Sequence, residues 1–217
     1  MPERSALVTG GTGRVGRAIA ARLEAEGFGV LAAGRKDGDI SLPAEARALV
    51  ERAVADMGGL DLLVNAASAG FEPRPVEEVD EAQWDAALGV TAKGSFFVTQ
   101  AAVPHLRQSD LGLVVMIEDV AAYQAWSSFA PHSAAKAAQA MLTRVLARAL
   151  APDVRVCGIA PGPVAVEPGQ QERRAAETLL GRIGSPEDVA TAVLYLVNAK
   201  FVTGTSLVVD GGRLLKP

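Results

Sequence analysis

The stretch "TGGTGRVG", residues 9–16, constrains the fold of this chain more than any other. It joins an apolar run at residues 5–10 to an amphipathic helical pattern, and its glycines recur every three residues. Glycines spaced in this way permit a tight turn and let backbone N–H groups approach a diphosphate, to which a helix N-terminus adds partial positive charge. A plain strand-to-helix turn needs only one glycine. The stretch therefore predicts a dinucleotide-binding loop, with Gly10, Thr12, Gly13, Arg14, Val15 and Gly16 as its binding residues.

Short β-like runs alternate with helical patterns along the rest of the chain, which is typical of a parallel sheet covered by helices on both faces. We expect further strands at residues 29–34, 60–67, 111–117, 154–162 and 205–212. Helix starts are indicated by Asp80 with Gln83, and by Ser185 with the proline that follows it. At 217 residues, without a linker or repeat, the chain is expected to form one α/β domain over residues 1–217.

One connection is unusually short. Only a few residues separate the second expected strand from "DIS" at residues 39–41, where a doubly wound fold normally needs a crossover helix and another strand, at least about 10–12 residues. The segment is either trimmed to a loop or retains a vestigial strand.

Composition excludes several classes of function. The net charge of −4 and the isoelectric point near 5.3 argue against a nucleic-acid or anionic-membrane partner, which would need a clustered basic face. No apolar run approaches the roughly 20 residues that span a bilayer, and the first residues lack the apolar core of a signal peptide. The single cysteine, Cys157, fits a reducing cytoplasm. His105 and His132 lie too far apart for a structural zinc site, so we expect no metal.

The residues after the second expected strand indicate which dinucleotide is bound. Gly34 is followed by Arg35 and Lys36, where an acidic residue would bind the ribose hydroxyls of NAD and a cation accommodates the 2′-phosphate of NADP. We therefore expect NADP(H) as cofactor, with NAD(H) possible. The alternative is that both cations are a solvated surface pair. Asp39 is the expected contact to the adenine.

Taken together, the motifs resemble those of the short-chain dehydrogenase/reductase family. The resemblance covers nearly all of the chain and includes "TGGTGRVG", "LDLLVNAAS", "HSAAK", "VRVCGIAPGPV", "GRIGSPEDVA" and "VTGTSLVVDGG". It implies a single-domain Rossmann-type fold, a doubly wound parallel sheet flanked by helices, here with the shortened segment after the second strand. It also implies hydride transfer between NAD(P)(H) and a small substrate, and a homotetramer or homodimer. The further cofactor-binding residues that it implies are Asn65, Ala66, Ala67, Lys136, Pro161, Gly162 and Val164.

The chain departs from the family pattern where the chemistry occurs. The tyrosine of the family's Tyr-x-x-x-Lys motif is His132, four residues before Lys136, and the catalytic serine position is Asp119. Pteridine reductases resemble this chain in having arginine at the position of Arg14, aspartate at the serine position and "NAS" after the fourth strand of the family's sheet. They keep the tyrosine, so that comparison supports a role for Asp119 and leaves His132 unexplained.

The expected catalytic residues are Asp119, His132 and Lys136. An ionised aspartate cannot donate a hydrogen bond and opposes a developing alkoxide, whereas it can accept from N–H groups and stabilise a cationic C=N group. A histidine can give or take a proton near neutral pH. The alternatives are that Asp119 caps a turn and that His132 only occupies the start of a helix.

Two functions from different classes remain open at this point. The first is an NADP(H)-dependent oxidoreductase acting on a small imine-like, pterin-like or carbonyl substrate. The second is a non-catalytic NADP(H)-binding protein, either a cofactor sensor or a partner subunit. The glycine loop fits both, the loss of the tyrosine favours the second, and a residue able to carry a proton at each changed position favours the first.

Overall fold

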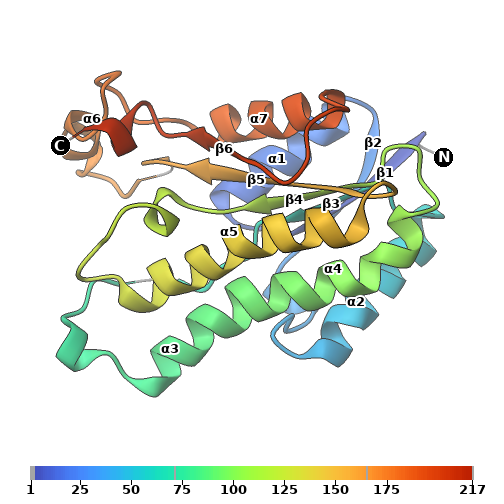
Figure 1. The fold of residues 1–217 in the computed structure, drawn as a ribbon, viewed down its shortest axis with the longest axis horizontal. Helices are drawn as coiled ribbons and strands as arrows, with labels where there is room; N and C mark the ends of the chain where they lie inside the picture. Colours follow the sequence, from blue (N-terminus) through green and yellow to red (C-terminus); the bar gives the residue numbers. More distant parts are fainter. Residues whose placement is uncertain (1–2, 71, 165, 217) are drawn as a thin grey trace.

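Residues 3–70, 72–164 and 166–216 are described by a computed structural model of the protein. They form an α/β domain with a six-stranded parallel sheet in the order β2-β1-β3-β4-β5-β6 and helices on both faces (Figure 1). The strands are β1 (Arg4–Thr9), β2 (Phe28–Ala33), β3 (Leu62–Asn65), β4 (Leu113–Ile117), β5 (Arg155–Pro161) and β6 (Ser206–Val209). The α-helices are α1 (Arg14–Ala25), α2 (Pro43–Met57), α3 (Glu81–Leu88), α4 (Ser95–Leu106), α5 (Ala130–Leu150), α6 (Gln171–Ala176) and α7 (Pro186–Asn198).

The remaining helical segments are short. They are the 3₁₀ turns η1 (Arg35–Asp37), η2 (Val76–Glu78), η4 (Val120–Ala122) and η5 (Arg213–Leu215), and the π-helical η3 (Gly89–Gly94), which joins α3 to α4. Within the described ranges, no helix is long and apolar enough to cross a membrane.

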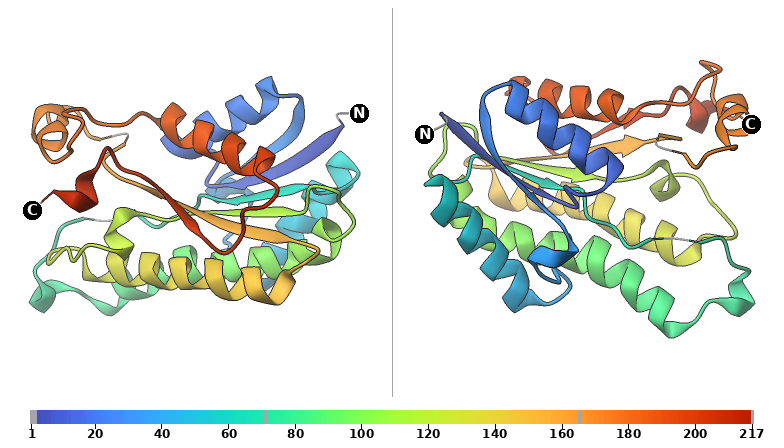
Figure 2. Two further views of the ribbon diagram at one scale, coloured as in Figure 1. Left: turned by 45° about the horizontal axis from the view of Figure 1, so that its top comes forward. Right: turned by 180° about the vertical axis from the view of Figure 1, so that it is seen from behind.

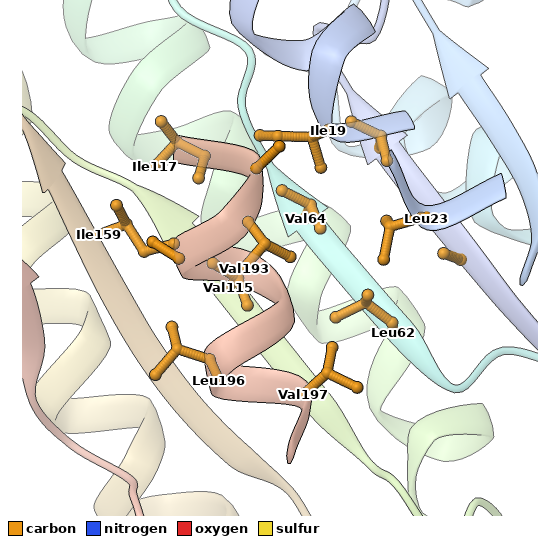
Figure 3. Close-up of a cluster of buried hydrophobic side chains, with 14 of the residues drawn as sticks. Ile19, Leu23, Leu62, Val64, Val115, Ile117, Ile159, Val193, Leu196 and Val197 are labelled. Atoms are coloured by element: carbon orange, nitrogen blue, oxygen red, sulfur yellow. The ribbon is translucent and has the colours of Figure 1, made fainter. Parts of the chain in front are cut away.

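The two faces of the sheet are covered by different helices, as the two views in Figure 2 show: α1 and α7 lie on one side, and α2, α4 and α5 on the other. Figure 3 shows how α7 buries its apolar face, with Val193 and Leu196 lying over side chains of the central strands beside Ile19 of α1. Strands β1, β3, β4 and β5 contribute fully buried side chains, because a strand with both faces covered can carry a nearly continuous apolar run.

The strand order places a switch point between β1 and β3. From β1 the chain moves outward to β2, and it then crosses back through α2 to β3 on the other side of β1. Connections leave β1 and β3 in opposite directions at this point, which opens a crevice at their carboxyl ends.

The short connection after β2 is a loop and contains no vestigial strand, so the first of the two expected alternatives is the one observed. Gly34 leads into the turn η1, and the chain reaches α2 at Pro43 without forming a strand. The Asp37 carboxylate folds back to accept a hydrogen bond from the Gly34 N–H, with an O···N distance of 2.9 Å. Strand β2 is therefore the edge of the sheet.

The two expected helix starts are confirmed as capping boxes. Asp80 and Gln83 exchange side-chain-to-backbone hydrogen bonds at the start of α3, and Ser185 and Asp188 do the same at the start of α7. Each pair satisfies two N–H groups that have no partner inside the helix.

The packing of α7 yields a prediction of stability. Leu196 is buried against the sheet and is 1% exposed, so Leu196→Ala should lower the free energy of unfolding by about 2–5 kcal/mol. Tyr195, the preceding residue, is 54% exposed and serves as the control; Tyr195→Ala should change it by less than about 0.5 kcal/mol. Urea denaturation measures both, and equal losses would contradict this packing.

Candidate functional site

The predicted site residues gather at one edge of the sheet, where parallel strands end side by side. Thr9 of β1 pairs in register with Ala33 of β2 and with Asn65 of β3, and Asn65 pairs with Met116 of β4. Ile117 of β4 in turn pairs with Ile159 of β5. The segments that follow these five strands therefore lie next to one another around the switch point. This is the position at which open α/β sheets bind ligands.

The glycine loop is built from backbone packed too closely for side chains. Gly10 has a φ of +67°, and a Cβ there would stand 2.7 Å from the backbone of Ala66. A Cβ on Gly16 would stand 2.2 Å from the carbonyl oxygen of Gly10. Gly13 is the N-cap of α1 and has no side chain to accept from the first N–H groups of the helix. The helix N-terminus is thus pressed against the end of β1, with its N–H groups available to an anion.

The residues after β2 form a second wall of this crevice. A Cβ on Gly34 would stand 2.6 Å from the Thr12 side chain, so the loop after β2 lies directly against the glycine loop. Arg35 and Lys36 are both exposed. Asp39 is exposed as well, and hydrogen bonding by Ser41, first through its side chain and then through its N–H, lowers the pKa of the Asp39 carboxyl.

Arg14 bridges the crevice. Its guanidinium donates to the carbonyl oxygen of Val166 over 3.2 Å and forms an ion pair with Glu167, both in the loop that follows β5. Arg14 and Glu167 are more than half exposed, so the pair is open to exchange with another anion.

The segments after β3 and β5 complete the crevice. Asn65 is fully buried; its amide donates to Thr99, whereas no hydrogen bond within the described residues reaches its side-chain oxygen. Ala66 and Ala67 follow directly, and Ala67 donates its N–H to the Thr9 hydroxyl over 3.3 Å. At the end of β5 lie Pro161, Gly162 and Val164, where a Cβ on Gly162 would stand 2.7 Å from Asp210.

Asp119 and His132 come together at the end of β4. The distance between His132 Nε2 and Asp119 Oδ2 is 3.4 Å, and the imidazole is only 5% exposed. The other carboxylate oxygen of Asp119 accepts the Ala121 N–H over 2.8 Å, so the side chain caps η4 as well. Asp119 thus caps a turn, as the alternative interpretation expected, and its second carboxylate oxygen still lies beside the His132 imidazole.

Lys136 lies one turn after His132 on α5 and is 4% exposed. Its ammonium group donates to the Ile117 carbonyl oxygen at 2.7 Å and to Gln139 Oε1 at 3.1 Å. Burial lowers the pKa of Lys136 to about 8, and the charges of Asp119 and Glu118 oppose that shift. The ammonium is therefore anchored inward by two of its three hydrogens.

Glu118 is a buried carboxylate that the sequence analysis did not single out. It accepts hydrogen bonds from the hydroxyls of Thr143, Ser206 and Tyr123, at 2.7, 3.0 and 2.7 Å. A Cβ on Gly158 would stand 1.9 Å from one of its oxygens, so only glycine fits opposite it. The signal in the sequence was "IED" at the end of an apolar strand, a charged residue where the strand pattern calls for an apolar one.

A cavity of about 560 Å³ opens beside His132. Its wall includes Phe129 and Thr91, the latter in the π-helical segment η3, and its rim carries charged residues such as Arg74 and Asp80. A cavity of this size suits a small organic molecule. Among the described residues, no group of three or more histidine, cysteine, aspartate and glutamate side chains could hold a metal ion.

Comparisons with known proteins show which family and fold the chain shares. The family model described as "Enoyl-(Acyl carrier protein) reductase" matches residues 21–213. The chain is 37% identical over 241 residues to the granaticin polyketide synthase putative ketoacyl reductase 2 of Streptomyces violaceoruber, covering 97% of this chain and 96% of the relative. It is 32% identical over 246 residues to the bovine (Bos taurus) dehydrogenase/reductase SDR family member 4, and the alignment covers 99% of this chain and 88% of the relative.

A solved structure shares the fold along almost the whole chain. The 3-ketoacyl-(acyl-carrier-protein) reductase of Brucella melitensis, solved with NADH, superposes with a TM-score of 0.91 at 27% identity, covering 98% of this chain and 99% of that one. The alignments with these two relatives run over more positions than the 217 residues of this chain, so the relatives carry additional residues.

The buried lysine gives a prediction about pH. The pKa of Lys136 is about 8 in the folded protein and 10.5 ordinarily, so between these values the unfolded chain binds more protons. The contribution of Lys136 to stability therefore rises with pH in this window. The free energy of unfolding is measured by urea denaturation at each pH from 7 to 10. Above pH 8, the free energy of unfolding of wild type should increase relative to that of Lys136→Met. The exposed Lys200→Met serves as the control, and a constant difference between wild type and Lys136→Met would contradict the prediction.

Proposed function

The chain belongs to the short-chain dehydrogenase/reductase family of oxidoreductases, and on that premise we propose that it moves hydride between NADP(H) and a small imine-like, pterin-like or carbonyl substrate. The whole chain, residues 1–217, is then one dinucleotide-binding domain. The observation that carries the proposal is the Asp119–His132 pair, which lies beside the cavity and at the same carboxyl edge of the sheet as the glycine loop.

The crevice fits a nicotinamide dinucleotide. The N–H groups at the start of α1 suit the diphosphate, which would take the place of Glu167 at Arg14. Ala66 and Ala67 line the crevice opposite Gly10, and Pro161, Gly162 and Val164 line it at the end of β5. The related Brucella reductase was solved with NADH, which supports a cofactor of this class.

The loop after β2 supports NADP(H) over NAD(H). Arg35 and Lys36 are exposed and follow the strand end that adjoins Thr12, where the adenosine ribose would lie. The carboxylate of Asp37 is turned away by its bonds to the Gly34 N–H and to Arg52. Two cations and an engaged carboxylate favour a 2′-phosphate.

The polar groups in the site suit reduction of a C=N bond. A reduced nicotinamide cofactor, when bound, would supply the hydride for the carbon. Asp119 accepts from an N–H group or stabilises the cationic nitrogen, and His132, within 3.4 Å of it, gives the proton that a neutral nitrogen needs. Lys136 keeps one ammonium hydrogen for a ribose hydroxyl, because its other two are held by Ile117 and Gln139.

We also propose that the protein is a homodimer or homotetramer. On the outer side of α5, Met141 and Val145 are 53% and 52% exposed and lie one turn apart. An adjacent apolar pair on a long helix is better explained by contact with another subunit than by contact with water.

Cofactor choice is tested by removing the first cation after β2. Arg35→Ala should weaken NADPH binding about tenfold or more, the value of one charge-assisted hydrogen bond, and should leave NADH binding nearly unchanged. Arg22→Ala is the control, since Arg22 pairs with Glu26 on the outside of α1. Isothermal titration calorimetry gives the dissociation constants of NADPH and NADH. If Arg35→Ala weakens the binding of both cofactors equally, Arg35 does not recognise the 2′-phosphate.

The chemistry is tested at His132. With a panel of cyclic imines, dihydropterins and aldehydes, His132→Ala should lower kcat by about 10²–10⁴-fold. The other histidine gives the control: His105→Ala, in the last turn of α4, should keep full activity. His132→Tyr should gain ketone reduction, since it restores the phenol of the family. Binding of NADPH without turnover of any substrate would instead favour the non-catalytic cofactor-binding protein.

A further inference from the structure

Arg213 is a nearly buried cation that the proposed reaction does not use. It follows β6 in the turn η5, and its side chain is 13% exposed. The guanidinium carbon lies 5.2 Å from the ring centre of Trp126, within reach of a cation–π interaction. One of its terminal nitrogens is paired with Glu177, whereas its Nε is buried without a hydrogen bond to any described residue.

The surroundings of Arg213 carry an excess of positive charge. Glu177 is shared, because Arg174 also contacts it at 3.1 Å, and Arg173 lies near enough for its charge to act on Arg213. Burial lowers the pKa of Arg213, as do the charges of Arg174 and Arg173, while Asp119 opposes them. Arg213 therefore shares Glu177 with Arg174, and two further guanidinium groups act on its charge.

The cluster adjoins the reacting groups. Asp119 lies within electrostatic reach of Arg213 and contacts His132 directly. Trp126, beneath Arg213, packs edge-on against Phe129 at 5.7 Å between ring centres, and Phe129 forms part of the cavity wall beside His132. Trp126 and Phe129 therefore link Arg213 to the wall of the cavity that also holds His132.

We propose that Arg213, with Arg174 beside it, binds an anionic group of the substrate, a carboxylate, sulfonate or phosphate, while Asp119 faces a cationic or N–H-bearing nitrogen of the same molecule. The substrate class is then a zwitterion such as an imino acid. This inference rests on the proposed function, because it assumes that the substrate reacts at Asp119 and His132.

The contacts of Arg213 explain why an anion is the missing ligand. An arginine fork binds a carboxylate or phosphate through two parallel hydrogen bonds, and here Glu177 occupies only part of that capacity. A buried N–H without an acceptor costs free energy that an arriving anion would recover. Trp126 supports the guanidinium and limits its freedom before binding.

The test uses two pairs of stable amines that differ only in charge and that span different lengths: proline with prolinamide, and 4-(aminomethyl)benzoate with 4-(aminomethyl)benzamide. Their dissociation constants are measured by calorimetry on wild-type protein loaded with NADP⁺. In at least one pair the carboxylate should bind about tenfold or more tightly than the amide. Arg213→Ala should abolish this preference without weakening the amide, and Arg213→Lys should keep part of it.

Two further variants separate binding from folding. Arg107→Ala, at an exposed arginine paired with Asp153 away from the site, should keep the full preference. Glu177→Gln should bind the carboxylate more tightly than wild type, because the competing anion is gone. Equal affinities within both pairs in wild type, or an undiminished preference in Arg213→Ala, would overturn the proposal. This binding test does not depend on catalysis. If the carboxylates bind more tightly but the protein reduces no substrate, the proposed reaction is contradicted and the anion site at Arg213 is still supported.

Discussion

The site depends on how closely the start of α1 approaches the end of β1. Gly16 lies against the carbonyl of Gly10 so tightly that a methyl group would stand 2.2 Å from the oxygen. This contact brings the first N–H groups of the helix to the crevice, and the positive φ of Gly10 brings the turn against Ala66 after β3. The glycine loop therefore fixes the start of α1 relative to the ends of β1 and β3, which form the crevice.

A second constraint is the charge buried at the end of β4. Two carboxylates, Glu118 and Asp119, follow each other in sequence and point to different partners: one to three hydroxyls in the interior, the other to His132. Lys136 is the cation that both influence. Such a group of charges is stable only when each member is hydrogen-bonded, and its carboxylates are the reason why we propose a nitrogen-bearing substrate.

Much of this arrangement could be predicted from the sequence, because local rules determine it. The spaced glycines, the two capping boxes and the alternation of strands with helices each follow from the preferences of a few neighbouring residues. The shortened connection was also visible as a count of residues, although its form as a loop was not. Contacts between distant segments could not be predicted: Glu167 reaching Arg14, and Arg213 reaching Trp126 from the end of the chain, depend on how loops fold over the sheet edge.

The proposed role of the backbone N–H groups at the start of α1, which is to hold the diphosphate of a nicotinamide dinucleotide, can be measured by calorimetric titration of the purified wild-type protein with NADPH and with NADH. If these groups have that role, binding is saturable with one site per chain and is tighter for NADPH. Absence of binding heat for both, confirmed by an unchanged melting temperature at millimolar cofactor, would contradict it.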